Sequence, residues 1–206
     1  MKLRTHTITD RTLGITRKKA AELPEPSLQD VTILSVDPGT TTSGWVFTKE
    51  FEVLEAGSGT ENDTVCHLIR SLPWDYLLIE EILMVYSGRT VGQSTFRTQL
   101  WAGMYFAHGH QLAPRHAAVR LIPRVDAVDW FRPQGQRTAN DATIRKEVLK
   151  RYPATGAGKT PEVGTHALPG PLFGVTDHAW QALGNAVFFL EHYHKRIPPT
   201  GYNPRD

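Results

Sequence analysis

The sequence predicts an α/β domain built on a mixed five-stranded sheet with helices on both faces. The first observation is the order of the expected elements: three strands, a helix, a strand, a helix, a strand, and then helices only. The second is that the runs VTILSV (31–36) and YLLI (76–79) are short and apolar, which is typical of buried strands. The third is that an acid, Asp37 or Glu80, directly follows each run. If these strands are parallel neighbours, both acids emerge at one edge of the sheet.

The other strands are weaker patterns than these two runs. Asp-Pro-Gly predicts a turn after the first strand, and residues 44–49 and 51–56 read as adjacent strands joined by a tight turn. The expected strands are residues 31–36, 44–49, 51–56, 76–79 and 118–122.

The helices are expected from apolar residues near helical spacing and from their boundary residues. The residues from Leu100 to Leu112 predict a long helix over 95–111. Pro73 ends the first helix, and Thr176 is the expected N-cap of the last one. The expected helices are residues 62–72, 95–111, 125–131, 140–152 and 176–195.

The chain divides into three parts. Residues 1–30 are polar, and residues 1–19 hold six Lys or Arg against one acid, which predicts an extension that is partly disordered or docks on a partner. Residues 31–195 form the predicted core domain, and residues 196–206 form a C-terminal tail.

Composition excludes several classes of protein. The chain has 206 residues, 40% hydrophobic and 21% charged, and no apolar run approaches the roughly 20 residues of a membrane helix. A single cysteine, Cys66, forms neither an internal disulfide nor a zinc cluster, which favours a reducing compartment such as the cytoplasm. The Arg/Thr-rich, acid-poor start leaves an organellar transit peptide as an alternative.

Three acids lie at the ends of elements: Asp37, Glu80 and Asp177. Each acid also has an ordinary structural explanation. Asp37 would belong to a turn, Glu80 would lie where a strand meets solvent, and Asp177 would be a first-turn acid that the helix dipole favours. A carboxylate at the end of a buried strand is costly unless it is paired or binds a cation. The three together therefore favour a divalent-metal site, with a nucleotide-phosphate turn at 37–43 as the other chemistry.

The segments LSVDPGTTTSGW, YLLIEE and TDHAWQALGNAV resemble the RuvC-type Holliday-junction resolvases of the ribonuclease H-like fold, with a phage or bacterial relative as the expected source. The resemblance covers about residues 31–194. It implies Asp37 and Glu80 as metal ligands and catalytic residues, together with Asp177 or His178 from the start of the last helix. Glu81 is the less favoured acid of its pair, because successive strand residues point to opposite faces.

The resemblance also implies an activity: structure-selective cleavage of branched DNA, above all four-way junctions, by two-metal phosphodiester hydrolysis with Mg²⁺ or Mn²⁺. A resolvase cuts two strands symmetrically, which implies a homodimer, and we expect the aromatic-rich helix at 95–111 to form its interface. No membrane association is expected.

Basic residues are expected to hold DNA phosphates, mostly in the stretch 132–151. An arginine in the loop at 82–93 is expected near the junction. The expected DNA-binding residues are Arg89, Arg132, Arg137, Arg145 and Lys146.

The chain departs from the family pattern at two positions. Gln181 stands where the family carries a second acid in the last helix, and Asp141 is the residue best placed where members tend to carry a lysine. Two alternatives therefore stay open: a non-catalytic module that binds branched nucleic acid, and an actin-like or kinase-type phosphate-binding protein. A chain of 206 residues is short for the two lobes of the latter.

Overall fold

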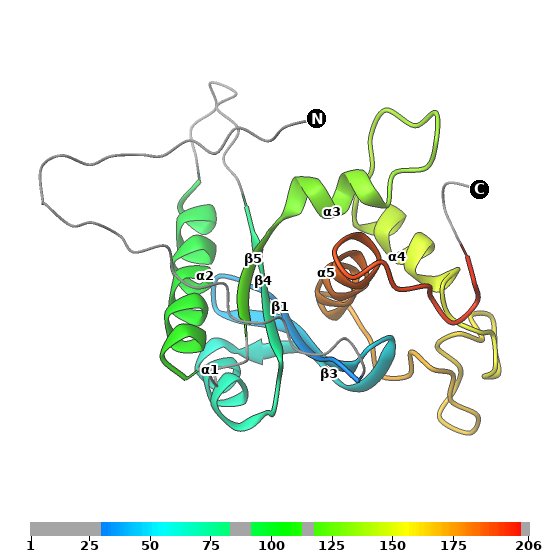
Figure 1. The fold of residues 1–206 in the computed structure, drawn as a ribbon, viewed down its shortest axis with the longest axis horizontal. Helices are drawn as coiled ribbons and strands as arrows, with labels where there is room; N and C mark the ends of the chain where they lie inside the picture. Colours follow the sequence, from blue (N-terminus) through cyan, green and yellow to red (C-terminus); the bar gives the residue numbers. More distant parts are fainter. Residues whose placement is uncertain (1–29, 83–91, 113–117, 203–206) are drawn as a thin grey trace, which may run out of the picture.

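The computed structural model describes residues 30–82, 92–112 and 118–202. The predicted fold class is confirmed: a five-stranded mixed sheet, with the order β3-β2-β1-β4-β5, carries helices on both faces (Figure 1). The extension at 1–29, the loop at 83–91 with Arg89, and residues 203–206 lie outside the described residues.

The sheet joins an antiparallel half to a parallel half at β1. β1 pairs antiparallel with β2 and parallel with β4, β4 pairs parallel with β5, and β2 pairs antiparallel with β3. The strands are β1 (Thr32–Asp37), β2 (Thr42–Lys49), β3 (Glu52–Glu61), β4 (Tyr76–Glu81) and β5 (Ala118–Pro123).

Two helices cover one face of the sheet and three lie on the other (Figure 1). The first face carries α1 (Asn62–Ser71) and α2 (Gln93–Leu112). The second carries α3 (Arg124–Trp130), α4 (Asp141–Leu149) and α5 (Ala179–His192). No helix within the described ranges is both long and apolar enough to span a membrane.

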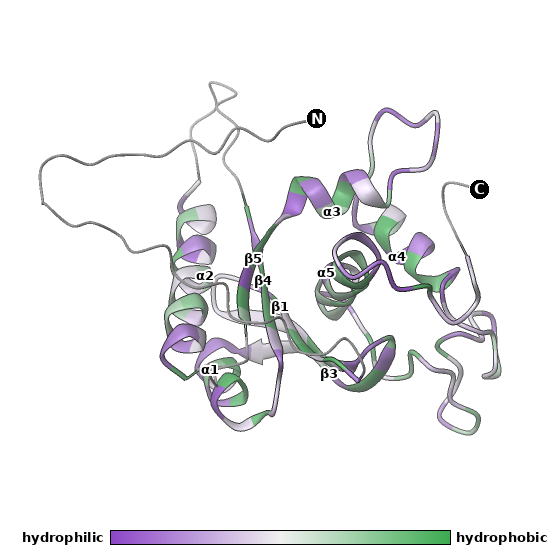
Figure 2. Ribbon diagram, in the orientation of Figure 1, coloured by the Kyte–Doolittle hydropathy of each residue, from purple (hydrophilic) through white to green (hydrophobic). Residues whose placement is uncertain are grey.

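The alternation of strand side chains separates two hydrophobic cores. Leu34 and Val36 of β1 pack toward α1 and α2, whereas Ile33 packs in the core around α5. α5 is buried along almost its whole length, from Ala179 to Glu191, and Figure 2 shows it as the most continuously apolar of the helices. A helix that is apolar on all sides is stable only in such a central position.

The last helix begins later than the sequence predicted. Its first residue is Ala179 and its N-cap is His178, without a side-chain cap hydrogen bond, so the expected N-cap at Thr176 is wrong. Asp177 has a φ of 38°, in the left-handed region, which separates it from the regular helix. The helix ends at His192 rather than at 195.

β3 is longer than predicted and reaches Glu61. Its second half, GSGTE, has few apolar residues, and its extended conformation comes from pairing with β2 rather than from local preference. The indole N–H of Trp45 on β2 donates to Thr60 Oγ1 at 2.9 Å across this pair.

Candidate active site

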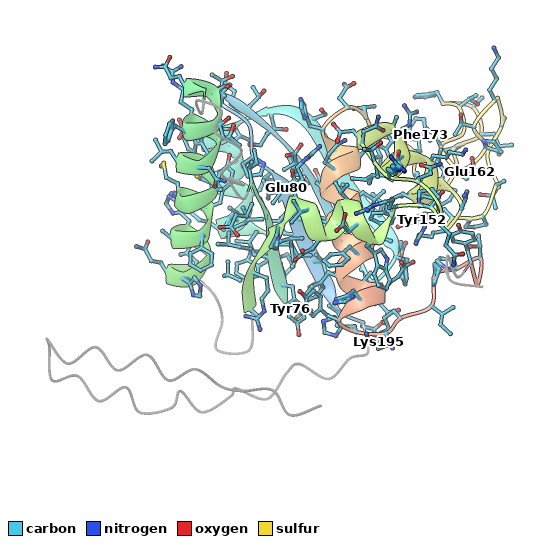
Figure 3. All side chains as sticks on the ribbon, turned by 90° about the horizontal axis from the view of Figure 1, so that it is seen from above. Tyr76, Glu80, Tyr152, Glu162, Phe173 and Lys195 are labelled. Atoms are coloured by element: carbon cyan, nitrogen blue, oxygen red, sulfur yellow. The ribbon has the colours of Figure 1, made fainter. Side chains whose placement is uncertain are left out.

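Asp37 and Glu80 end two neighbouring parallel strands. Val36 pairs with Ile79 in the register of β1 and β4, so the next residue of each strand falls at the same edge of the sheet. Since Val36 and Ile79 pack toward α1 and α2, alternation turns the two acids toward α5. Asp37 is only 9% exposed and Glu80 only 4%. Figure 3 places Glu80 centrally, at the opposite end of β4 from Tyr76.

The first residues of α5 supply the polar groups that face these acids. His178 Nδ1 lies 3.1 Å from Asp37 Oδ2, and Asn185 Nδ2 donates to Glu80 Oε2 at 3.1 Å. His178, Gln181 and Asn185 are three and four residues apart, so they share one face of the helix. Gln181 is buried between the two contacts, on the face that meets the acids.

A basic residue that the sequence analysis did not single out completes the cluster. Arg124 directly follows β5 and begins α3. Its Nη1 donates to Glu80 Oε1 at 2.6 Å, and its Nη2 pairs with Asp141 at the start of α4. Glu80 is therefore paired on both oxygens, by a guanidinium and by an amide.

The electrostatics of the two acids differ sharply. The pKa of Asp37 is raised from 3.8 to about 8, first by burial and then by the neighbouring charge of Glu80. Asp141 raises it further, and the opposing effect of Arg124 does not compensate. Asp37 is a buried carboxyl group for which the nearby positive charge of Arg124 does not offset burial and the neighbouring acids.

The backbone around Asp37 is built for close approach of α5. Gly44 is the β-sheet partner of Asp37, and a Cβ on it would lie 2.3 Å from the carbonyl carbon of His178. A glycine is required there because any larger residue would push the helix start away. The His178 N–H also donates to Ser58 Oγ on β3 at 3.2 Å, which fixes the helix start from the other side.

The turn that follows Asp37 is held by a small hydrogen-bond network. The Gly39 N–H donates to Ser43 Oγ at 3.2 Å, and Asn62 Nδ2 donates to the Gly39 carbonyl at 3.2 Å. Ser43 Oγ in turn donates to Asn62 Oδ1 at 2.7 Å. These bonds restrain the Pro-Gly-Thr turn and hence the position of the Asp37 carboxylate.

The structure brings together three of the four residues predicted as catalytic. Asp37, Glu80 and His178 meet at the sheet edge, as described above. Asp177 is exposed, and within the described residues its side chain forms no hydrogen bond or ion pair. Alternation turns Glu81 to the other face of the sheet from Glu80.

The predicted DNA-binding residues are only partly near this cluster. Arg145 and Lys146 are exposed on α4, and Arg145 lies over the Trp180 ring of α5, with its Cζ 4.9 Å from the ring centroid. Arg137 is exposed in the segment before α4. Arg132 pairs with Asp129 at the end of α3.

Arg124 and Asn185 are the residues that sequence reasoning missed. Arg124 follows the third parallel strand, at the same sheet edge as the two acids, so the rule that found Asp37 and Glu80 also covers it. Asn185 lies seven residues after His178, which is two helical turns along the same face.

The residues present fit a divalent ion at Asp37 better than a closed cage of ligands. Within the described part of the chain, no group of three or more His, Cys, Asp or Glu side chains is arranged to hold a metal ion. Asp37 and His178 nonetheless offer an oxygen and a nitrogen donor 3.1 Å apart, and a bound cation would offset the burial and the negative neighbours that raise the pKa of Asp37. Glu80 is near but is engaged by Arg124.

The fold is α/β, with a mixed five-stranded sheet that carries helices on both faces. No protein-family model matches the sequence, and no curated protein matches it. Among solved structures, Thermus thermophilus RuvC is similar, with a TM-score of 0.51 and 12% identity over 80% of this chain and 96% of that chain. Thermus thermophilus RuvC in complex with a Holliday junction substrate aligns over the same shares with a TM-score of 0.49 and 12% identity. At this identity the likeness concerns the fold alone.

Proposed function

We propose that this protein is a metal-dependent, structure-selective DNA endonuclease that acts on four-way junctions. The observation that carries the proposal is the placement of Asp37 and Glu80, two buried carboxylates on adjacent parallel strands, opposite His178 at the start of α5. A structural role alone gives no reason to bury Asp37 beside Glu80, where burial and the neighbouring carboxylate both disfavour its ionised form.

Asp37 and His178 would hold the divalent ion, which supplies Lewis-acid activation of water and neutralises phosphate charge when bound. A bound cation would favour the ionised form of Asp37, because it would offset the cost of the buried charge. The His178 imidazole is exposed at the same edge of the sheet, and its Nδ1 lies next to the Asp37 carboxyl group. Asn185 and Arg124 fix both oxygens of Glu80, so that its carboxylate faces the same point.

Basic side chains next to the cluster would bind the DNA backbone. Arg145 and Lys146 lie on α4, whose first residue, Asp141, pairs with Arg124 of the cluster. Arg137 lies just before α4. Phosphate contacts of this kind position a substrate without reading its sequence, which suits recognition of a branched shape.

A homodimer would present two such sites to the two strands of a junction. α2 is the proposed interface, because Phe96 and Leu100 are exposed on it, one helical turn apart. A monomeric mass at micromolar concentration, with junction cleavage retained, would count against this interface.

The test of the function uses the full chain with end-labelled four-way junction, flap, linear duplex and single-stranded DNA. Each DNA is incubated with Mg²⁺, with Mn²⁺ or with a chelator. We expect metal-dependent cleavage of the junction in preference to the linear duplex. Junction binding without cleavage under any metal condition would replace the enzyme with a binding module, and ATP binding without DNA cleavage would favour the kinase-like alternative.

A further inference from the structure

Arg124 pairs with two of the carboxylates at the site. Its guanidinium lies between two carboxylates, with Nη1 at 2.6 Å from Glu80 Oε1 and Nη2 paired with Asp141. The Glu80 carboxylate is buried, and its other oxygen is taken by Asn185. The Arg124 guanidinium is therefore already the counter-charge of the Glu80 carboxylate.

The formal charge of the cluster is matched to a single divalent ion. Asp37, Glu80 and Asp141 carry three negative charges when ionised and Arg124 carries one positive charge, which leaves minus two. Gln181 adds none, although it lies on the helix face that meets the acids. Two divalent ions would bring four positive charges to a cluster that can neutralise two.

We propose that the site holds one divalent ion, at Asp37 and His178, and that Arg124 takes the place of a second ion and binds the phosphate of the DNA. The inference rests on the proposed nuclease site, and it replaces the two ions that the family resemblance implies. Its ligands are one Mg²⁺ or Mn²⁺ and a phosphodiester.

The side chain of Arg124 is suited to binding a phosphate. A guanidinium carries five N–H donors, and its ion pairs with Glu80 and Asp141 use two of them. Its side chain is 33% exposed, so a phosphate can reach it from solvent. The planar fork of the guanidinium suits two oxygens of one phosphate. The ion pair with Asp141 keeps the side chain extended toward the site.

The first test counts ions rather than products. Mn²⁺ is titrated into the full-length protein, and bound ions are measured by calorimetry and by the loss of the free Mn²⁺ signal in electron paramagnetic resonance. We expect one Mn²⁺ per chain. Two ions per chain in the unaltered protein would overturn the proposal.

Substitutions at Arg124 then separate its charge from its shape. Arg124→Gln removes the charge, and we expect a second Mn²⁺ to bind and the first to bind about tenfold more tightly. Arg124→Lys keeps the charge, and we expect one ion. Arg120→Gln changes an exposed arginine on the preceding strand, β5; it is the matched control and should bind one ion with unchanged affinity. An Arg124→Gln protein that binds one ion with unchanged affinity would overturn the proposal.

Cleavage kinetics distinguish phosphate binding from simple support of Glu80. For junction DNA we expect Arg124→Gln to lower kcat/KM by about 100-fold and Arg124→Lys by about tenfold, because lysine keeps the charge and loses the fork. Equal losses in both variants would overturn the phosphate role. If no protein cleaves DNA but the ion counts are as expected, the one-ion site stands and the proposed function falls.

Discussion

α5 has a group of buried charges at each end, and the two groups differ in how completely they are paired. The Asp37 cluster consists of Asp37, Glu80, Arg124, Asp141 and His178. The Arg151 cluster lies at the C-terminal end of α5 and consists of Glu147, Arg151 and Glu191 with Trp130 and Tyr202.

The Arg151 cluster satisfies its charges with hydrogen bonds from several elements. Arg151 is fully buried, and its Nε and Nη2 donate to the two oxygens of Glu191 at 2.6 and 3.0 Å. Its Nη1 donates to the Glu147 carbonyl at 2.6 Å, and Trp130 donates to Glu191 at 2.7 Å. Lys150 and Tyr202 both donate to the Glu147 carboxylate.

The Asp37 cluster leaves one carboxyl without equivalent support. Asp37 has a single described hydrogen-bond partner for its side chain, the exposed imidazole of His178, and burial raises its pKa to about 8. A buried charge that is fully paired stabilises the packing of the elements that supply its partners. A buried carboxyl group with few partners can still bind a cation. The comparison favours a structural role for the Arg151 cluster and supports the functional role proposed for the Asp37 cluster.

The largest effect is expected from replacing the Asp37 carboxyl group. Asp37→Asn should lower junction cleavage by about 1,000-fold or more, because the amide is a poor ligand for a divalent ion. Junction binding should be retained or become tighter, since a negative charge beside the phosphate is removed. Cleavage and gel-shift assays measure the two effects. Glu81→Gln, on the other face of the strand, is the control, and normal cleavage by Asp37→Asn would contradict the site.

The next effect is on stability and comes from the other end of α5. Arg151→Met should lower the free energy of unfolding by about 3–5 kcal/mol, because it leaves Glu191 buried without its partner. Urea unfolding measures this loss. Adding Glu191→Leu should recover part of it. Cleavage per folded molecule should change little, and a loss as large as that of Asp37→Asn would abolish the distinction between the clusters.

A smaller effect is expected from the backbone under the site. Gly44→Ala should lower cleavage by about 10- to 100-fold, because its methyl group would displace the start of α5 and separate His178 from Asp37. Steady-state cleavage and thermal unfolding would be compared. Gly59→Ala changes a glycine of β3 that has open space around its Cβ position and a φ of 65°, so it serves as a control for backbone strain without a clash.

The smallest effect is a dependence of stability on pH in the metal-free protein. The pKa of Asp37 is about 8 in the folded chain against 3.8 for the free side chain, so between these values the folded state holds a proton that the unfolded state has released. The free energy of unfolding should therefore fall as the pH rises from about 4 to about 8.

Two comparisons check this assignment. Asp37→Asn should lose the component of the slope that belongs to Asp37, and Mn²⁺ should stabilise the unaltered protein more at pH 8 than at pH 5. A slope that is the same in both proteins would show that another group produces it.

The parts of the fold that sequence patterns predicted are those with strong local signals. The runs before Asp37 and Glu80 are apolar because both faces of their strands are covered, and this pattern located β1 and β4. The late start of α5 has no local signal, since the left-handed Asp177 is set by contacts of His178 with Gly44 and Ser58, more than a hundred residues away.

The candidate site divides in the same way. Asp37 and Glu80 followed from strand ends, and the family resemblance implied His178 or Asp177 from the start of the last helix. The sequence alone did not distinguish His178 from Asp177. In the structure Asp177 has a positive φ, and it is the next side chain, that of His178, that contacts Asp37. The sequence also did not predict the role of Arg124, because its partner Glu80 lies 44 residues away in the chain.

The seven-residue spacing from His178 to Asn185 sets a limit on how this sequence can diverge. The two side chains are about 10 Å apart along the helix axis, and each meets the end of a different strand. Deleting one residue between them would rotate Asn185 by about 100° away from Glu80. Homologues should therefore keep the length of this segment unchanged, while insertions should accumulate in the loop at 153–175.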